Sequence, residues 1–299
     1  MKKLFTTSPA LQLFLLLFIL FVALLLTVTV SVALAPIFGF SLSEAQAGTS
    51  IRNLALTRYL MAVQSIGGFM LPPALAAFLI CRKRACIFLG VARRPMAQSA
   101  ALTALALVIA IPFISFSASV NAQLPLPEWA TRTDREATEL SVALIFTPSV
   151  PVMLLNMLVM ALIPAVSEEL LFRGYLQRLL CSWTKKPHFA IFISAVIFSA
   201  IHFQFEGFIP RFLLGALFGY LFYWSGSLWL SVIAHFTNNA ATVIAYFYAA
   251  RQGVDVESAE VETTVSALLA LASVFVATNL IARIQQHEKF RRKRHLHPA

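Results

Sequence analysis

Residues 167–176 read SEELLFRGYL, and they follow LLNMLVMALIPAV at 154–166. The preceding run is almost wholly apolar and has the composition of a membrane-spanning helix. The bilayer centre penalises a charged side chain by about 2.5–3.5 kcal/mol on insertion scales, so charges at this depth are paired or functional. This stretch therefore predicts a membrane helix with a polar site inside it.

The rest of the chain has the same apolar character. Of its 299 residues, 59% are hydrophobic and 12% are charged, about half the charged share of roughly 25% that soluble domains have. A spanning helix needs about 20 apolar residues. Eight candidate segments are found at 10–35, 55–80, 99–121, 147–180, 188–205, 208–224, 227–249 and 262–284. We therefore predict an all-α, polytopic membrane helix bundle of about eight transmembrane helices.

These segments extend over the whole chain, so we expect a single integral membrane domain, 1–299. Within it we distinguish residues 1–146, with three helices and an outer loop at 122–146, and a core at 147–250. Residues 285–299 form a basic cytoplasmic tail. The first helix is expected to stay uncleaved, because its apolar run is longer than that of a signal peptide.

Lysine and arginine are unevenly divided between the two sides of the predicted membrane. With the N-terminus inside, 17 of the 23 basic residues fall in inner segments. Cytoplasmic loops of membrane proteins carry such an excess, so we expect both termini in the cytoplasm. Because the basic residues flank membrane segments, the net charge of +10 predicts contact with the lipid bilayer and no nucleic acid partner.

The charged stretch contains a candidate ion pair and a candidate catalytic group. Glu169 and Arg173 are four residues apart, with the acid on the N-terminal side, which is the favoured order along a helix. Glu168 points about 100° away around the same helix and has no local cation. A carboxyl group in apolar surroundings is suited to general acid or base catalysis near neutral pH. Glu168 is therefore a candidate catalytic residue, and the other two are candidate supporting residues.

Two later segments also carry polar side chains inside apolar sequence. His202 ends the run AIFISAVIFSAIH at 190–202, and the stretch HFTNN at 235–239 carries His235 and Asn239 four residues apart. The second spacing turns both side chains to one helix face, whereas Asn238 is one helical step off it and is set aside. An imidazole and an amide on one face are suited to hold a developing oxyanion. With Glu168 and His202 activating water, the pattern predicts direct attack of water on an amide.

Each of these residues also has a purely structural interpretation. The charged pair can be an interfacial ion pair, and histidine or asparagine can join membrane helices by hydrogen bonds. A proton-coupled transporter would also use buried carboxylates and imidazoles. Transporters, however, often show paired repeats in both halves, and here the polar groups lie only in the second half. The stretch GALFG at 215–219 favours close helix packing without a chemical role.

Three motifs together resemble those of a known family. EELLFR at 168–173, FSAIH at 198–202 and HFTNN at 235–239 are similar to the EExxxR, FxxxH and HxxxN motifs of the CPBP (Abi) group of intramembrane proteases. This group includes the CAAX prenyl endopeptidases and bacteriocin-processing or immunity proteins. The resemblance covers about residues 147–250, and no motif position departs from the pattern.

The resemblance implies an eight-helix, glutamate-dependent membrane endopeptidase. It implies that Glu168 and His202 activate the water and that His235 and Asn239 form the oxyanion site. It also implies that the Glu169–Arg173 pair supports the helix geometry. The alternative is a non-catalytic membrane immunity or scaffold protein of the same fold.

The family resemblance leaves the substrate open between prenylated C-terminal cysteine motifs and bacterial peptides or membrane proteins. The short loops of this chain resemble those of bacterial members of the family. For a bacterial member, prenylated substrates are not expected. We therefore expect hydrolysis of a membrane-associated protein or peptide in the bacterial inner (cytoplasmic) membrane. No cofactor is expected. The alternative is zinc on Glu168, His202 and His235, although the sequence lacks a HExxH pair and the amide of Asn239 is a poor zinc ligand.

Overall fold

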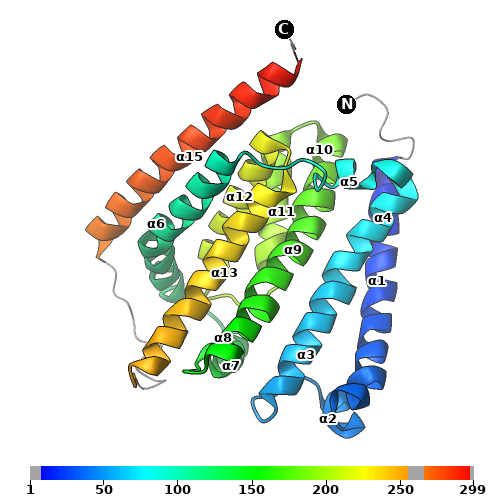
Figure 1. Cartoon of the computed structure of the whole chain (residues 1–299), viewed down its shortest axis with the longest axis vertical. Helices are drawn as coiled ribbons and strands as arrows, with labels where there is room; N and C mark the ends of the chain where they lie inside the picture. The colour runs from blue at the N-terminus through cyan, green and yellow to red at the C-terminus, as the bar shows by residue number, and fades with distance from the viewer. Residues whose placement is uncertain (1–7, 255–265, 297–299) are drawn as a thin grey trace.

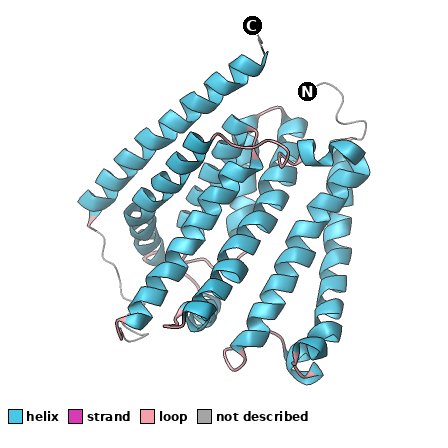
Figure 2. Ribbon diagram, in the orientation of Figure 1, coloured by secondary structure: helices cyan, strands magenta, loops and turns pink. Residues whose placement is uncertain are grey.

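The computed structural model describes residues 8–254 and 266–296. Within these ranges every regular element is a helix, and the helices lie side by side in one bundle (Figures 1 and 2). This confirms the predicted all-α fold. Two of the basic residues used to predict the orientation, Lys2 and Lys3, lie outside the described ranges.

The first half of the chain supplies two long antiparallel spans and a third that leads to the core. Its elements are α1 (Pro9–Leu34), η1 (Ala35–Phe38), α2 (Leu42–Ala47), α3 (Leu54–Gln64), η2 (Ser65–Met70), α4 (Leu71–Cys81), η3 (Arg82–Arg84), α5 (Ala85–Phe88) and α6 (Ala97–Ala122). The helices α3 and α4 continue through η2, a π-helical stretch, and pack beside α1 (Figure 1).

The second half contains one long, irregular span and further helices, most of which pack against it. Its elements are α7 (Glu128–Ile145), α8 (Val150–Asn156), η4 (Met157–Leu162), α9 (Ile163–Glu169), η5 (Leu170–Gln177), α10 (Arg178–Thr184), α11 (Pro187–Ala200), α12 (Phe208–Ser225), α13 (Leu228–Arg251) and α15 (Ala267–Leu296). The segment Val150–Thr184 is continuous, and the π-helical stretches η4 and η5 lie on either side of α9. Stretches of π-helix are frequent at functional sites.

Six helical segments in the described ranges are long and apolar enough to cross a membrane. They are Pro9–Phe38, Leu54–Phe88, Ala97–Ala122, Val150–Thr184, Leu228–Arg251 and Ala267–Arg291. The predicted spans 188–205 and 208–224 are not among them. In their place are α11, with 14 residues, and α12, with 18 residues. Helix α11 ends at Ala200 because the chain then enters a tight turn. Side chains of α6 and α7 hold this turn by hydrogen bonds to its backbone.

The prediction of a loop over 122–146 is wrong, because α7 occupies Glu128–Ile145. Alanine, glutamate, arginine and leucine are good helix formers, and Glu128 lies in the first turn, where an acid interacts well with the helix dipole. The helix turns Ala130, Asp134 and Val142 inward. It therefore packs against the bundle as an amphipathic helix.

Of the predicted basic tail at 285–299, residues 285–296 are helical and continue α15. A buried Glu288 lies 3.4 Å from the Arg291 side chain one turn later. Helix α15 packs along α6 at one side of the bundle (Figure 1).

Candidate active site

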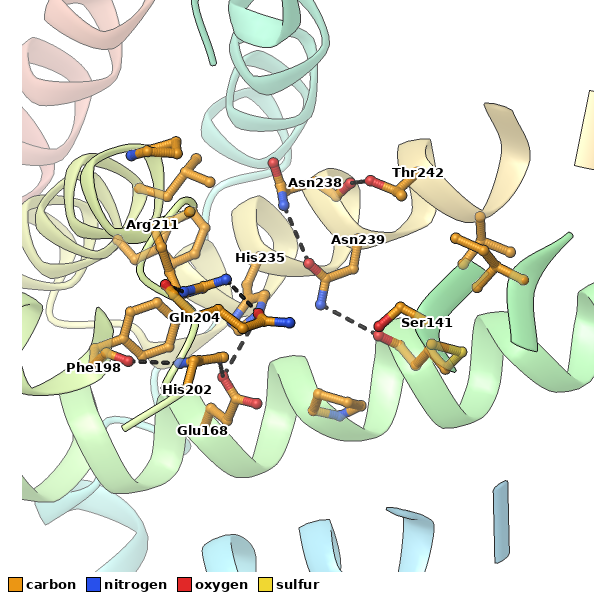
Figure 3. Close-up of a pocket in the computed structure, with 18 of the residues that line it drawn as sticks. Ser141, Glu168, Phe198, His202, Gln204, Arg211, His235, Asn238, Asn239 and Thr242 are labelled. Atoms are coloured by element: carbon orange, nitrogen blue, oxygen red, sulfur yellow. Dashed lines mark hydrogen bonds and ion pairs between the residues drawn. The ribbon is translucent and has the colours of Figure 1, made fainter. Parts of the chain in front are cut away.

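A pocket of about 480 Å³ lies among α7, α9, α12, α13 and the turn after α11. Glu168, His202, His235 and Asn239 all line it, as Figure 3 shows. The structure therefore brings the four predicted catalytic residues to one cavity from three separate parts of the chain.

Glu168 lies between the two histidines. Its Oε2 is 4.0 Å from Nε2 of His202 and 3.9 Å from Nε2 of His235. Both separations are longer than a direct hydrogen bond. Glu168 Oε2 is buried, and it accepts no hydrogen bond from any residue that the structure describes. A buried carboxylate oxygen without a hydrogen bond costs free energy. In a native structure such an atom indicates a functional role or a bound water molecule.

The other ring nitrogen of each histidine is held in place. Nδ1 of His202 is 2.8 Å from the carbonyl oxygen of Phe198, and Nδ1 of His235 is 2.9 Å from Oε1 of Glu169. A carbonyl or an ionised carboxylate only accepts, so Nδ1 is the donor in both rings. Each neutral ring therefore presents an unprotonated Nε2 toward Glu168.

The Glu169–Arg173 pair is present and completely buried. Nη1 of Arg173 donates to Oε1 of Glu169 at 2.8 Å, and Nη2 donates to the carbonyl oxygen of Gly215 at 2.9 Å. The guanidinium also lies 4.4 Å from the centroid of the Phe198 ring, a favourable cation–π distance. Oε1 of Glu169 thus serves both Arg173 and His235, so the pair fixes the orientation of the His235 ring.

Gly215 and Gly219 of the GALFG stretch let α12 approach the charged helix closely. A Cβ at Gly215 would lie 3.2 Å from Nη2 of Arg173, and one at Gly219 would lie 2.8 Å from Oε1 of Gln177. The carbonyl oxygens of both glycines accept hydrogen bonds from those side chains. The stretch predicted to pack helices therefore also allows Arg173 its second hydrogen bond.

Asn239 is oriented by a neighbour that the sequence reasoning set aside. Its Oδ1 accepts from Nδ2 of Asn238 at 3.2 Å, and its own Nδ2 donates to the carbonyl oxygen of Met160 at 3.3 Å. Asn238 also lines the pocket. The only sequence signal for this role was its position beside Asn239.

Arg211 is a second residue that the sequence reasoning did not place at the site. It lies near the start of the predicted span 208–224, and it lines the pocket with Gln204 (Figure 3). Its Nη1 donates to the carbonyl oxygen of Gln204 at 3.1 Å, and its Nη2 donates to Oε1 of the same residue at 2.7 Å. The sequence signal that could have placed Arg211 at the site is its position as an arginine inside an apolar helix.

The zinc alternative, on Glu168, His202 and His235, places a requirement on the distances in the site. A tetrahedral zinc site with bonds of about 2.0–2.2 Å holds its ligand atoms about 3.3–3.6 Å apart. Glu168 Oε2 is farther than this from both Nε2 atoms. Within residues 8–254 and 266–296, no three His, Cys, Asp or Glu side chains form a group that could hold a metal ion. To share a zinc ion, Glu168 Oε2 and the two Nε2 atoms need to lie closer together than they do here.

Comparison with known proteins assigns the segment that carries this site. Residues 150–241 match the sequence model of a family described as type II CAAX prenyl endopeptidase Rce1-like. We call this matched segment the Rce1-like domain. The domain begins at α8 and ends within α13, so it contains all six candidate site residues. The family predicted from the three motifs is confirmed, and that family is one of proteases.

The other comparisons are narrower. The uncharacterized protein YpbD of Bacillus subtilis (strain 168) is 31% identical over 89 residues, which are 28% of this chain and 42% of YpbD. The similarity thus spans less than half of that relative. No solved structure matches the chain. The Rce1-like domain and the six apolar spans together make the chain an integral membrane protein.

Proposed function

We propose that this protein is an intramembrane endopeptidase that hydrolyses a peptide bond of a membrane-associated protein or peptide. The observation that carries the proposal is the Glu168 carboxylate, which faces two imidazole Nε2 atoms at 4.0 and 3.9 Å in one pocket. The Rce1-like domain around these residues supports peptide hydrolysis as the reaction.

Glu168 and His202 are placed to hold the attacking water. A separation of 4.0 Å between Oε2 and Nε2 allows a water molecule beside the line joining them to lie at hydrogen-bond distance from both. Both atoms are acceptors, and a water molecule has two hydrogens to donate. The water oxygen is then free to direct a lone pair at a carbonyl carbon.

The reaction needs no group beyond these residues and water. The water oxygen forms a bond to the carbonyl carbon while one water proton passes to Glu168, which gives a tetrahedral oxyanion. Collapse of this intermediate breaks the C–N bond, and Glu168 returns the proton to the leaving amine. Glu168 thus acts first as general base and then as general acid.

His235 and Asn239 are placed to stabilise the oxyanion. Asn239 holds its Nδ2 at the pocket with a hydrogen bond of 3.3 Å to Met160, which a stronger acceptor can replace. Nε2 of His235 carries no proton in the neutral ring described above, so it donates to the oxyanion only after the ring has taken up a proton from solvent. Donors fixed in advance toward a developing charge are often the largest single contribution to catalysis.

We propose that the reaction requires no metal. Exhaustive treatment of the purified protein with EDTA and 1,10-phenanthroline is expected to leave the cleavage rate unchanged, because the charge of the oxyanion is met by side-chain donors. The measurement is the initial rate before and after treatment, with zinc then added back. Loss of activity that zinc restores would support the alternative zinc site.

We further propose a bacterial inner membrane location with both termini in the cytoplasm. Figure 1 shows α5, α10 and the last turns of α15 at one end of the bundle, with α2 and α7 at the other. The first end carries several clusters of basic residues, which supports a cytoplasmic position. They are Arg82–Arg84, Arg93 and Arg94, Lys185 and Lys186, and Lys289 and Arg291.

The proposed activity is tested with the purified full-length protein in proteoliposomes. The substrates are single-span bacterial membrane peptides, with prenylated C-terminal cysteine peptides as a second set. We expect cleavage of at least one substrate and a loss of about 10²–10⁴-fold in kcat for His202→Ala, with unchanged thermal unfolding in detergent. A wild-type protein that binds these peptides but cleaves none would favour the non-catalytic alternative.

A further inference from the structure

The turn that carries His202 is held by side chains from other helices as well as by the two helices that it joins. This turn, residues 201–207, joins α11 to α12, and we call it the His202 turn. Phe203 within it has a left-handed φ of 51°, a conformation that costs free energy for a bulky side chain. Such a conformation persists when surrounding contacts determine it.

Asp134 of α7 supplies the strongest of these contacts. The backbone N–H of Phe205 donates to Oδ1 and Oδ2 of Asp134 at 2.8 and 3.0 Å, and the N–H of Glu206 donates to Oδ2 at 2.8 Å. The Asp134 side chain is buried, at 3% exposure. Hydrogen bonds from backbone N–H groups to a carboxylate are about twice as strong as neutral ones.

Two more side chains hold the same turn. Asn121 of α6 donates from Nδ2 to the carbonyl oxygen of Phe205 at 3.0 Å and accepts at Oδ1 from the N–H of Ile209 at 2.6 Å. The Trp129 ring of α7 meets the Phe205 ring edge to face at 5.2 Å. The backbone of the turn is thus fixed on both sides of Phe205.

None of these three side chains belongs to the Rce1-like domain. Asn121, Trp129 and Asp134 precede residues 150–241, and α7 is the segment in which the sequence predicted a loop. Within the domain, the bond from Nδ1 of His202 to Phe198 fixes the ring, and the N–H groups of His202 and Phe203 bond to Ser199 and Ala200. The backbone that follows, at Phe205 and Glu206, is held by side chains of α6 and α7.

We propose that Asp134 is a positioning residue, which acts through the backbone of Phe205 and Glu206 to hold His202 beside Glu168. The inference rests on the proposed function for its catalytic consequence. It assigns α7 the role of a support for the site, and it makes the distance from His202 Nε2 to Glu168 Oε2 depend on a residue outside the matched domain.

The test compares Asp134→Ala, Asp134→Asn and the control Glu136→Ala in the full-length protein. Glu136 is an exposed acid on the same helix, so its change removes the same charge without touching the turn. We expect Asp134→Ala to lower kcat by about 10–100-fold with KM unchanged, because misplacement by about 1 Å can cost about 10²-fold. Asp134→Asn should recover part of this loss, since its Oδ1 keeps one acceptor for the two N–H groups.

A second measurement does not depend on activity. Imidazole ¹⁵N signals of His202, assigned with a His202→Gln variant, should shift in Asp134→Ala while those of His235 stay, and amide exchange over 201–207 should accelerate. Glu136→Ala should change neither. If the wild type cleaves nothing, the proposed catalysis fails but these signals still decide the positioning. Three results for Asp134→Ala would overturn the inference. They are unchanged amide exchange over 201–207, equal ¹⁵N shifts at both histidines, and faster exchange with unchanged kcat in an active protein.

Discussion

Replacing Glu168 with glutamine is expected to lower kcat for peptide hydrolysis by about 10²–10⁴-fold while the bundle stays folded. The amide has nearly the shape of the carboxyl group but cannot take a proton from water or return it to the leaving amine. Among the described residues, no lysine or arginine nitrogen lies within 4.0 Å of the Glu168 carboxylate, and the nitrogen atoms of other side chains near it are the two imidazole Nε2 atoms. Its loss should therefore cost catalysis and little stability.

The matched control is Glu139→Gln, an exposed acid on α7 that does not line the pocket. Kinetics in proteoliposomes, with thermal unfolding in detergent for each variant, give the comparison. Substrate affinity of the Glu168→Gln variant should stay near the wild-type value, because the change acts on the transition state. A variant that keeps more than about a tenth of wild-type kcat would contradict the role of Glu168 as general base, since such a base contributes at least about 10²-fold.

The sequence was informative about the site wherever the geometry follows from spacing along a single helix. The four-residue spacing of Glu169 and Arg173 predicted their ion pair, and the structure contains it at 2.8 Å even though Arg173 lies in a π-helical stretch. Helical spacing also predicted a shared face for His235 and Asn239, and both line the pocket. The catalytic roles of these residues stay predictions.

The parts that the sequence did not predict depend on contacts between distant segments. Asp134 reaches Phe205 across 71 positions, and no local pattern distinguishes it from the exposed acids around it on α7. Arg211 lies in the predicted span 208–224, and hydropathy alone does not show that this helix begins at the pocket. The end of α11 at Ala200 was also missed, because the run stays apolar through Ile201 and Phe203 while tertiary hydrogen bonds end the helix.

Replacing Arg173 with methionine is expected to destabilise the protein by about 3–5 kcal/mol, the usual cost of breaking a buried ion pair. Arg173 and Glu169 are both fully buried, so the variant leaves the Glu169 carboxylate without its cation. It also removes the hydrogen bond to the Gly215 carbonyl oxygen. The measurement is the free energy of unfolding in detergent, by chemical denaturation that leaves the micelle intact.

The double variant Glu169→Gln with Arg173→Met separates two causes of the lost stability. One is the unpaired charge left on Glu169, and the other is the loss of the Arg173 side-chain contacts. Removing both members of a buried pair is often nearly neutral, so the double variant should recover most of the stability lost by Arg173→Met. The side-chain oxygen of the introduced glutamine can still accept from Nδ1 of His235, which should preserve the ring orientation that the 2.9 Å bond to Glu169 sets. If the double variant is as unstable as the single one, the Arg173 side chain stabilises the bundle through the Phe198 and Gly215 contacts, and the charge balance with Glu169 contributes little.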